Sequence, residues 1–244
     1  MGTWVQNGFV LELLESPQKQ PKIFECILPI ILEDNHIAII NKPAGLIVSG
    51  NYFKTVYNAL PFNLEKSNCI DALPWPTPLH RLDSQTSGLL LIAKTKTAQV
   101  ELQNQFKNNS IQKKYCTIVV GKVLTNQKIT TPIEEKEAET TFEIIKIIKS
   151  LKYNDLSCLK VSPKTGRTHQ IRIHLSSINY PIFGDKLYGN LENVHVGKGL
   201  FLAATELTFL HPKSFEKVHI KIDTPPKFLS LLKREERRWN TYNK

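Results

Sequence analysis

One acidic residue stands out in a short segment whose side chains could do chemistry. Residues 80–95 read HRLDSQTSGLLLIAKT and place Arg81 and Asp83 between a proline-rich stretch and a run too apolar for the surface. If the segment is extended, residues two apart project to the same side, so both charges would face one site. A carboxylate beside a guanidinium stays ionised, as nucleophilic attack or proton abstraction requires. Asp83 is therefore a candidate catalytic residue; a turn or capping aspartate that pairs with Arg81 is the alternative.

Basic side chains gather in a second segment, residues 162–177 (SPKTGRTHQIRIHLSS). Its basic members are Lys164, Arg167, His169, Arg172 and His174. They surround the expected start of a helix, where free backbone N–H groups and the helix dipole attract anions, so phosphate contacts are expected. A solvated basic helix end is the alternative, but basic residues suit the last turn of a helix better than the first. The two histidines are five residues apart, which does not match the four-residue spacing of a zincin, so no metal site is expected.

A third segment, Gln112-Lys113-Lys114-Tyr115, opens an expected strand with two cations and one aromatic ring. A tyrosine next to lysines can stack on an extruded base while the lysines meet the phosphates. A tyrosine that only packs on the core at a strand edge is the more common arrangement. The segment is thus compatible with nucleic-acid binding without requiring it.

Composition points to a polyanionic partner and away from a membrane. The 244 residues include 32 Lys+Arg and 22 Asp+Glu, a formal net charge of +10, and such a surplus favours nucleic acid. Cys26, Cys69, Cys116 and Cys158 form no CxxC pair and no zinc-finger spacing, so reduced thiols are expected. The sequence has no signal peptide and no run of about 18 apolar residues. We therefore expect a cytoplasmic location.

The remaining pattern predicts the elements that must position these side chains. Apolar or β-branched runs predict strands at residues 37–40, 89–93, 115–120, 140–148, 156–161 and 218–222. Helical spacing of apolar residues predicts helices after Thr97, after Gly166 and over residues 228–239. More strands than helices, without strict alternation, indicate an α+β fold.

Two stretches are predicted to be irregular. The prolines of residues 75–78 (WPTP) exclude a helix or a central strand, so an irregular loop is expected before His80. Residues 1–22 are expected to form an arm and linker, which leaves residues 23–244 as one domain with a single core.

Four segments in this order resemble the RluA-type pseudouridine synthases. HRLDSQTSGLLLIAKT is similar throughout to the family signature HRLDxxTSG, in which the aspartate is catalytic. PKTGRTHQIRIHL followed by PIFGDKLYG looks like the family's basic motif, KKY matches its tyrosine motif, and EDNHIAIINKPAGLIVSG resembles its opening motif. The resemblance covers about residues 28–225. It implies one catalytic domain on a long, mixed but mainly antiparallel sheet flanked by helices and loops, as in pseudouridine synthases.

The resemblance also implies an activity and roles for single residues. It predicts an enzyme that isomerises uridine to pseudouridine in structured ribosomal or transfer RNA, without a cofactor or metal and as a monomer. By the same resemblance, Asp83 is the catalytic carboxylate, Arg172 its basic partner and Tyr115 the aromatic that stacks on the base, while Arg81 helps to hold the target nucleotide out of the stack. The other expected RNA-binding residues are His80, Lys113, Lys114, Lys164, Arg167 and His169. The short arm is too small for a separate RNA-binding module, so the catalytic domain is expected to select the RNA.

Two other functions fit parts of the pattern. A non-catalytic RNA-binding protein with the same fold would keep the basic groove, although it would have no use for an acidic group there. A glycoside or nucleoside hydrolase would need a second carboxylate. The other candidate within these motifs, Asp185 in GDKLYG, is interpreted as a turn residue.

Overall fold

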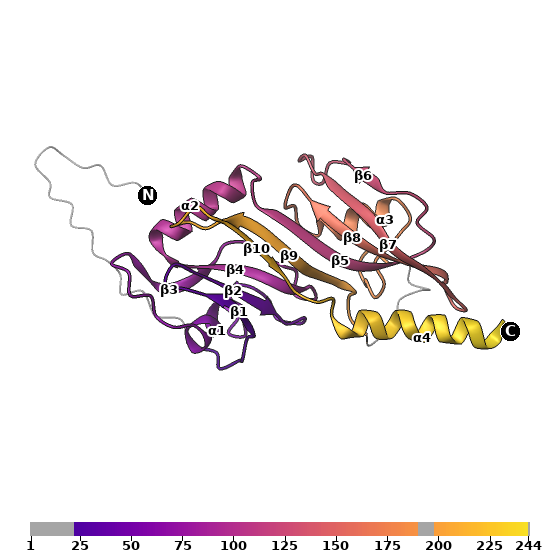
Figure 1. Cartoon of the computed structure of the whole chain (residues 1–244), viewed down its shortest axis with the longest axis horizontal. Helices are drawn as coiled ribbons and strands as arrows, with labels where there is room; N and C mark the ends of the chain where they lie inside the picture. Colours follow the sequence, from indigo (N-terminus) through magenta and orange to yellow (C-terminus); the bar gives the residue numbers. More distant parts are fainter. Residues whose placement is uncertain (1–21, 190–197, 244) are drawn as a thin grey trace, which may run out of the picture.

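The computed structural model describes residues 22–189 and 198–243, and these form an α+β fold around one long sheet. Figure 1 shows the sheet running through the molecule, with β1–β4 in one half, β6–β8 in the other, and β5 and β9 between them. The α+β class and the long, mainly antiparallel sheet predicted above are confirmed. The predicted arm, residues 1–22, lies outside the described residues except for Lys22.

Within the described residues the sheet has ten strands, and only one pairing between them is parallel. Eight strands follow the order β1-β2-β4-β9-β5-β8-β7-β6, while β10 pairs with β9 and β3 with β4. The strands are β1 (Ile30–Glu33), β2 (Ile37–Lys42), β3 (Ala72–Pro78), β4 (Ser87–Thr95), β5 (Gln112–Val120), β6 (Gln127–Ile129), β7 (Thr140–Ser150), β8 (Asn154–Pro163), β9 (Leu202–Leu210) and β10 (Lys217–Lys221). The parallel pair is β4 with β9.

In the part of the chain that the structure describes, four helices pack on this sheet. They are α1 (Val56–Asn63), α2 (Lys96–Lys107), α3 (Gln170–Ser177) and α4 (Pro226–Tyr242). Helix α1 contacts β3, α2 contacts β3 and β4, α3 contacts β7 and β8, and α4 lies along β7. Helix α2 begins at Lys96, just before the predicted Thr97, because the Thr95 hydroxyl accepts a hydrogen bond from the Ala98 N–H at 3.2 Å and caps it.

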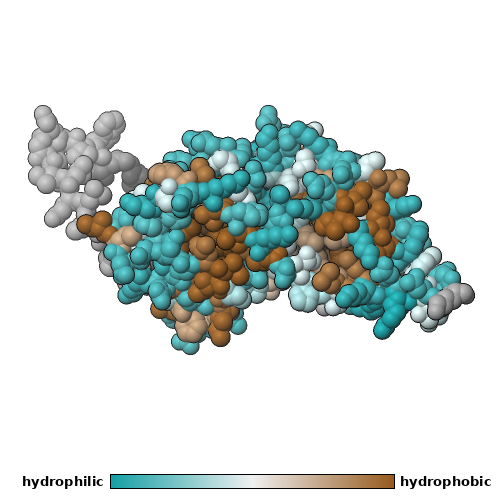
Figure 2. Space-filling model, viewed as in Figure 1, coloured by the Kyte–Doolittle hydropathy of each residue, from teal (hydrophilic) through white to brown (hydrophobic). Residues whose placement is uncertain are grey.

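The continuous apolar run of β4 is explained by burial on both faces. Leu90 and Ile92 belong to the larger core, whereas Leu89, Leu91 and Ala93 belong to a second core on the other face, where α2 packs. A strand covered on both faces has no polar side to alternate with its apolar one. On the outside, Figure 2 shows hydrophobic groups in separate patches over both halves of the sheet, surrounded by hydrophilic side chains.

The close pairing of β4 with β9 brings the predicted site segments together. Gly88 has φ +117°, and a Cβ atom there would lie 2.1 Å from the Ala204 carbonyl oxygen, so only glycine allows this approach. Ala204 is also paired with Tyr115 of β5. Strand β9 therefore lies between the loop that carries Asp83 and the strand that carries Tyr115.

The fold differs from the sequence predictions at residues 75–78 and in elements that were not predicted, namely α1, β1, β6 and β9. Residues 75–78 do not form an irregular loop but belong to β3, which pairs with one strand only and with a register shift between Ala72 and Thr77. Proline is tolerated there because such a strand leaves some N–H positions without a required partner. The central strand β9 was not predicted, since its sequence LAATELTFL mixes small, charged and apolar residues.

Candidate active site

Asp83 lies at the wall of a cavity that several distant segments of the chain line. Its side chain is 23% exposed, and the cavity has a volume of about 540 Å³. The loop before β4 supplies Arg81 and Asp83, β5 supplies Lys113 and Tyr115, and residues 165–172 form the facing wall. Segments far apart in the sequence thus meet at one carboxylate.

The carboxylate of Asp83 pairs with Arg172 of α3 rather than with Arg81. Its Oδ2 accepts a hydrogen bond from Nη1 of Arg172 at 3.3 Å. Arg81 is exposed at the cavity wall and forms no ion pair with Asp83 within the described part of the chain. Asp83 does begin a turn, since its carbonyl accepts a hydrogen bond from the Thr86 N–H at 3.0 Å, but neither the ion pair with Arg81 nor a capping bond from the Asp83 carboxylate is found among these residues. The partnership with Arg172 agrees with the family-based expectation.

Arg172 is itself held by a second carboxylate, Asp185. Nε of Arg172 donates to Oδ2 of Asp185 at 2.7 Å, and Nη2 donates to Oδ1 at 2.8 Å. The backbone N–H groups of Leu187 and Tyr188 donate to Oδ1 as well, so Asp185 is the predicted turn residue. It is also a partner that sequence reasoning missed. Burial alone would raise the pKa of Asp185, but these donors hold it below the ordinary value.

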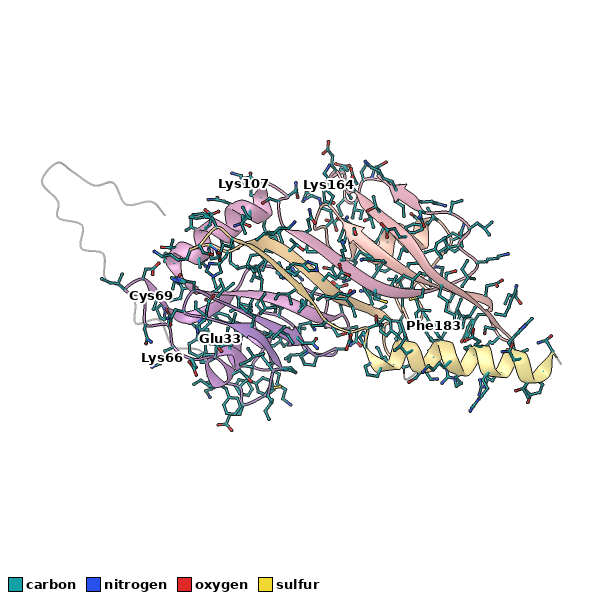
Figure 3. The ribbon with its side chains drawn as sticks, in the orientation of Figure 1. Glu33, Lys66, Cys69, Lys107, Lys164 and Phe183 are labelled. Atoms are coloured by element: carbon teal, nitrogen blue, oxygen red, sulfur yellow. The ribbon has the colours of Figure 1, made fainter. Side chains whose placement is uncertain are left out.

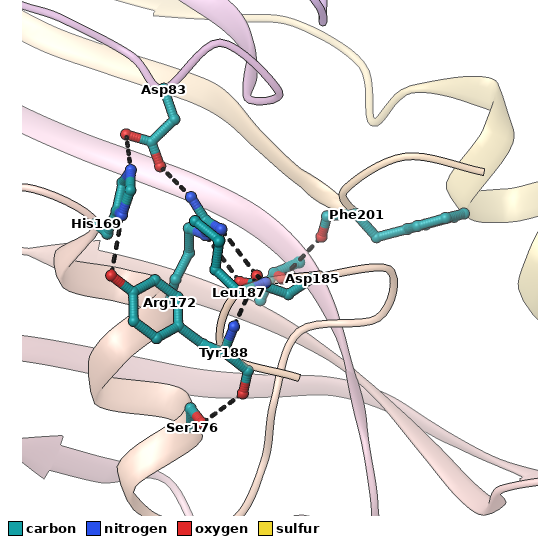
Figure 4. A network of polar contacts seen from close by, with 9 residues as sticks. Asp83, His169, Arg172, Ser176, Asp185, Leu187, Tyr188 and Phe201 are labelled. Atoms are coloured by element: carbon teal, nitrogen blue, oxygen red, sulfur yellow. Dashed lines mark hydrogen bonds and ion pairs between the residues drawn. The ribbon is translucent and has the colours of Figure 1, made fainter. Parts of the chain in front are cut away.

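The ring of Tyr188 fixes both Arg172 and His169 (Figure 4). The Arg172 guanidinium lies over the Tyr188 ring, 5.1 Å from its centre, and the Tyr188 hydroxyl bonds to Nδ1 of His169 at 3.0 Å. Nε2 of His169 is 3.7 Å from Oδ1 of Asp83. His169 precedes α3 in a left-handed conformation, with φ 54°, which costs free energy in a non-glycine residue. The network therefore places an imidazole and a guanidinium on the two oxygens of one carboxylate.

Tyr115 and Lys113 face the cavity from strand β5, and Lys114 does not. Alternate residues of a strand point to opposite faces, so Lys114 instead pairs with Glu206 on the other side of the sheet at 3.4 Å. Lys114 therefore does not line the cavity that Lys113 and Tyr115 face, and its predicted contact with RNA stays a prediction. Burial, and then the charge of Asp83, raise the pKa of Tyr115, so this phenol stays neutral.

The basic segment before α3 is only partly in the cavity. Arg167 lines it and donates from Nε to the Glu137 carbonyl at 2.9 Å. Lys164 is exposed, lies 3.8 Å from Glu139 and is not among the lining residues. Figure 3 shows Lys164 on the same edge of the molecule as Lys107, at the end of α2. Lys164 thus lies outside the cavity, at the outer edge of the molecule, and its predicted phosphate contact stays a prediction.

Two predicted histidines are held by the protein itself. His174 is fully buried, and its ring nitrogens bond to the Thr140 hydroxyl at 2.8 Å and the Thr131 carbonyl at 2.9 Å, so it cannot meet a phosphate. His80 lines the cavity, but its Nε2 accepts a hydrogen bond from the Leu91 N–H at 3.1 Å. Burial, together with the charge of Lys113, lowers the pKa of His80 to about 3. His80 is thus a neutral wall of the cavity, not a cation for phosphate.

The buried Lys42, for which no role was predicted from the sequence, connects the loop after β2 to the loop that carries Asp83. Lys42, at the end of β2, is fully buried, and its Nζ donates to the carbonyls of Pro43 at 2.9 Å, Leu46 at 2.6 Å and Ser84 at 3.1 Å. Burial lowers its pKa to about 8, although the Asp83 carboxylate acts in the opposite direction. A lysine at the end of an apolar strand, directly before Pro-Ala-Gly, was the signal in the sequence.

Two further properties concern the described residues as a whole. Within residues 22–189 and 198–243, no group of three or more His, Cys, Asp or Glu side chains is arranged to hold a metal ion. None of the four helices is long and apolar enough to cross a membrane.

Comparison with known proteins gives one consistent result. The family described as RNA pseudouridylate synthase matches residues 36–177. A Zymomonas mobilis protein named ribosomal large subunit pseudouridine synthase D is 33% identical over 233 residues, which is 84% of this chain and 72% of that protein. An uncharacterized RNA pseudouridine synthase of Aquifex aeolicus is 35% identical over 90% of this chain and 77% of its own length. The solved structure of human RNA pseudouridylate synthase domain containing 1 has the same fold, with a TM-score of 0.69, 23% identity and coverage of 84% and 86%.

Proposed function

The chain belongs to the RluA-type RNA pseudouridylate synthases and is an isomerase that converts uridine in RNA to pseudouridine; from this premise we propose that Asp83 is its catalytic carboxylate. The observation that carries the proposal is the placement of Asp83 in the cavity wall, with Arg172 at 3.3 Å and the neutral phenol of Tyr115 nearby. An ionised carboxylate is what either attack on the ribose or abstraction of a proton requires.

The reaction is an internal exchange of one bond for another. The N1–C1′ bond breaks with the electron pair going to uracil, the uracil turns, and C5 bonds to C1′. The proton leaves C5 and N1 ends with a proton, so uridine and pseudouridine have the same atoms. In our proposal Asp83 acts on the ribose while Arg172 holds its carboxylate in position, and the Tyr115 ring packs against the uracil as it turns. The reaction consumes no water, so the cavity has to retain the uracil between cleavage of the N1–C1′ bond and formation of the C5–C1′ bond.

A hydrolase that uses two carboxylates is disfavoured by the same geometry. Such an enzyme needs a second acid that can protonate a leaving group or activate water. Asp185 cannot serve, because its side chain is fully buried and both oxygens accept hydrogen bonds from Arg172. The proposed role of Asp185 is to orient Arg172.

The RNA itself is proposed from the relatives. Because proteins named ribosomal large subunit pseudouridine synthase C and D are 33 to 34% identical to this chain, we propose large-subunit ribosomal RNA as the substrate. The target uridine would have to leave its stack to bring C1′ to Asp83, which favours a strained or unpaired loop. We also propose that residues 23–244 act as one catalytic domain, as a monomer, without cofactor or metal, and in the cytoplasm.

Two measurements test the proposal. The first maps pseudouridine across total RNA from cells with and without the gene, and the loss of a position in large-subunit RNA would identify the substrate. The second compares the wild-type protein with Asp83→Asn on that RNA. If Asp83→Asn still forms pseudouridine at a near wild-type rate, Asp83 is not the catalytic residue.

A further inference from the structure

The cavity is chemically divided, and one part has no task in the reaction proposed above. Asp83, Tyr115 and Arg172 are the lining residues that act in the proposed reaction. A second group of lining residues comes from the residues before Arg81, from α2 and the turn after it, and from the start of β5; it consists of Leu79, His80, Phe106, Lys107, Asn109 and Lys113. This second group, which we call the Phe106 wall, presents rings and cations and contains no carboxylate.

The rings of the Phe106 wall are suited to a nucleobase. Phe106 is half-buried, packs against the second core and still faces the cavity. The His80 ring lies 5.2 Å from the Phe106 ring at 40° and is neutral. Uncharged aromatic rings that are fixed at a wet cavity stack on any base, whatever its sequence. Phe106 is therefore an available stacking surface, separate from Tyr115.

Lys113 supplies a cation without a protein partner. Its Nζ lies over Phe106, 5.8 Å from the ring centre, and would be 3.8 Å from a Cβ atom on Gly166 across the cavity. Within the described ranges, no carboxylate forms an ion pair with Lys113. A half-buried ammonium group without a counter-ion favours an anion from solution, and in a cavity that takes RNA that anion is a phosphate.

The spacing on β5 corresponds to neighbouring nucleotides. Lys113 and Tyr115 are two residues apart on one face of the strand, so their Cα atoms are separated by roughly 7 Å. Adjacent stacked nucleotides lie only ~3.4 Å apart, so a base at Tyr115 and a phosphate at Lys113 fit a strand that is extended rather than stacked between them. The target uridine at Tyr115 and a splayed neighbour at Phe106 would satisfy both positions.

We propose that the Phe106 wall is a second nucleotide subsite, in which the base adjacent to the target uridine leaves the stack and packs on Phe106 while Lys113 binds the phosphate between them. This inference rests on the proposed function of the cavity. It makes the neighbour part of what the enzyme recognises, because a base that stays stacked in its RNA cannot reach Phe106.

The test removes the neighbouring base from the RNA and the ring from the protein, each alone and both in combination. The probe is a stem-loop RNA with the mapped uridine, prepared intact and with an abasic nucleotide on its 5′ or its 3′ side. Conversion at limiting enzyme is measured for wild type, Phe106→Leu, which keeps an apolar side chain, and Phe106→Tyr, which keeps the ring. We expect one abasic RNA to slow wild type and Phe106→Tyr about tenfold. On intact RNA, Phe106→Leu should be about tenfold slower than wild type. It should convert the abasic RNA no more slowly than it converts the intact RNA.

The control is Phe62→Leu, at an exposed phenylalanine of α1 that does not line the cavity, and it should keep the full abasic penalty. The wild-type comparison needs no variant, so the absence of any abasic penalty there rejects the subsite even if Phe106→Leu folds poorly in a thermal melt. No penalty at either neighbour, or an equal penalty in wild type and Phe106→Leu, would overturn the subsite. Failure of wild type to convert the intact RNA would instead reject the proposed function.

Discussion

The two faces of strand β5 carry neighbouring lysines in opposite situations. Lys114 points away from the cavity and lies 3.4 Å from Glu206, which also pairs with Lys160 at 3.0 Å. Lys113 points into the cavity and forms no ion pair among the described residues. The back of the sheet therefore neutralises its own charges, whereas the cavity keeps a cation free. Buried charges without partners are costly to stability, so the difference indicates that the cavity is built for an anionic ligand.

The acidic residues of the two faces differ in the same way. Burial alone would raise the pKa of Glu206, but Lys160 and Lys114 bring it below its ordinary value, so its charge is used within the protein. Asp83 is more exposed than Glu206, and the guanidinium of its partner Arg172 is already bound on its other side by Asp185. If the comparison is right, changes on the cavity face alter conversion and changes on the other face alter stability.

The largest expected effect is at Asp83. Asp83→Asn keeps the shape and removes the charge, so conversion should fall on the order of 10³-fold or more, with little change in RNA binding because the phosphate contacts remain. The matched change on the other face, Glu206→Gln, should leave conversion near wild type and lower the free energy of unfolding by about 2 kcal/mol. Conversion rates and urea unfolding of both variants measure this, and a loss of conversion in Glu206→Gln as large as in Asp83→Asn would break the comparison.

A smaller effect is expected at Asp185, which combines both roles. Asp185→Asn replaces the charged partner that orients Arg172 with a neutral amide. Conversion should therefore fall about 10-fold to 100-fold, and the free energy of unfolding should fall by about 3 kcal/mol. Because the pKa of Asp185 is lowered by folding, its stabilisation is present above the pKa of the unfolded chain and is lost as the pH falls toward the folded value. The difference in free energy of unfolding between wild type and Asp185→Asn should therefore shrink as the pH falls from neutral to acidic. A constant difference between the two would contradict this assignment.

The lysine pair gives the most direct comparison of the two faces. Lys113→Ala should weaken RNA binding several-fold and reduce the slope of log affinity against log salt by about 0.7 to 0.9, the contribution of one phosphate contact. Lys114→Ala should change neither quantity, since this lysine pairs with Glu206. Filter-binding titrations over a series of salt concentrations measure both. Equal slopes for the two variants would mean that the faces do not differ in their use of charge.

The smallest effect concerns Lys42, whose pKa is lowered to about 8 by burial. Between that value and the higher pKa of the unfolded chain, the unfolded state binds more protons, so stability rises with pH. From about pH 7.5 to about pH 9 this contribution amounts to about 1 kcal/mol. Urea unfolding of wild type and of Lys42→Met at both pH values isolates it, because the other titrating groups are shared. The same pH dependence in both proteins would show that Lys42 does not titrate in this range.

The sequence by itself determined the family and those local elements whose residue pattern is strong. Apolar runs long enough to be buried predicted β2 and β4, the spacing of Ile171 and Leu175 predicted α3, and HRLD with KKY and the basic segment indicated the family. These signals are local, because periodicity and motif spacing are properties of a few consecutive residues.

Only the tertiary structure decided which of the charged residues meet. Lys113 and Lys114 are neighbours of the same residue type, and the alternation along β5 directs them to opposite faces of the sheet. Asp185 was predicted only as a turn residue, and the structure shows that it also binds Arg172 of α3. The central strand β9 has no clear pattern of its own, yet its contact with Gly88 joins the Asp83 loop to Tyr115. Pairing between distant strands depends on packing and register across the sheet, which no short stretch of sequence contains.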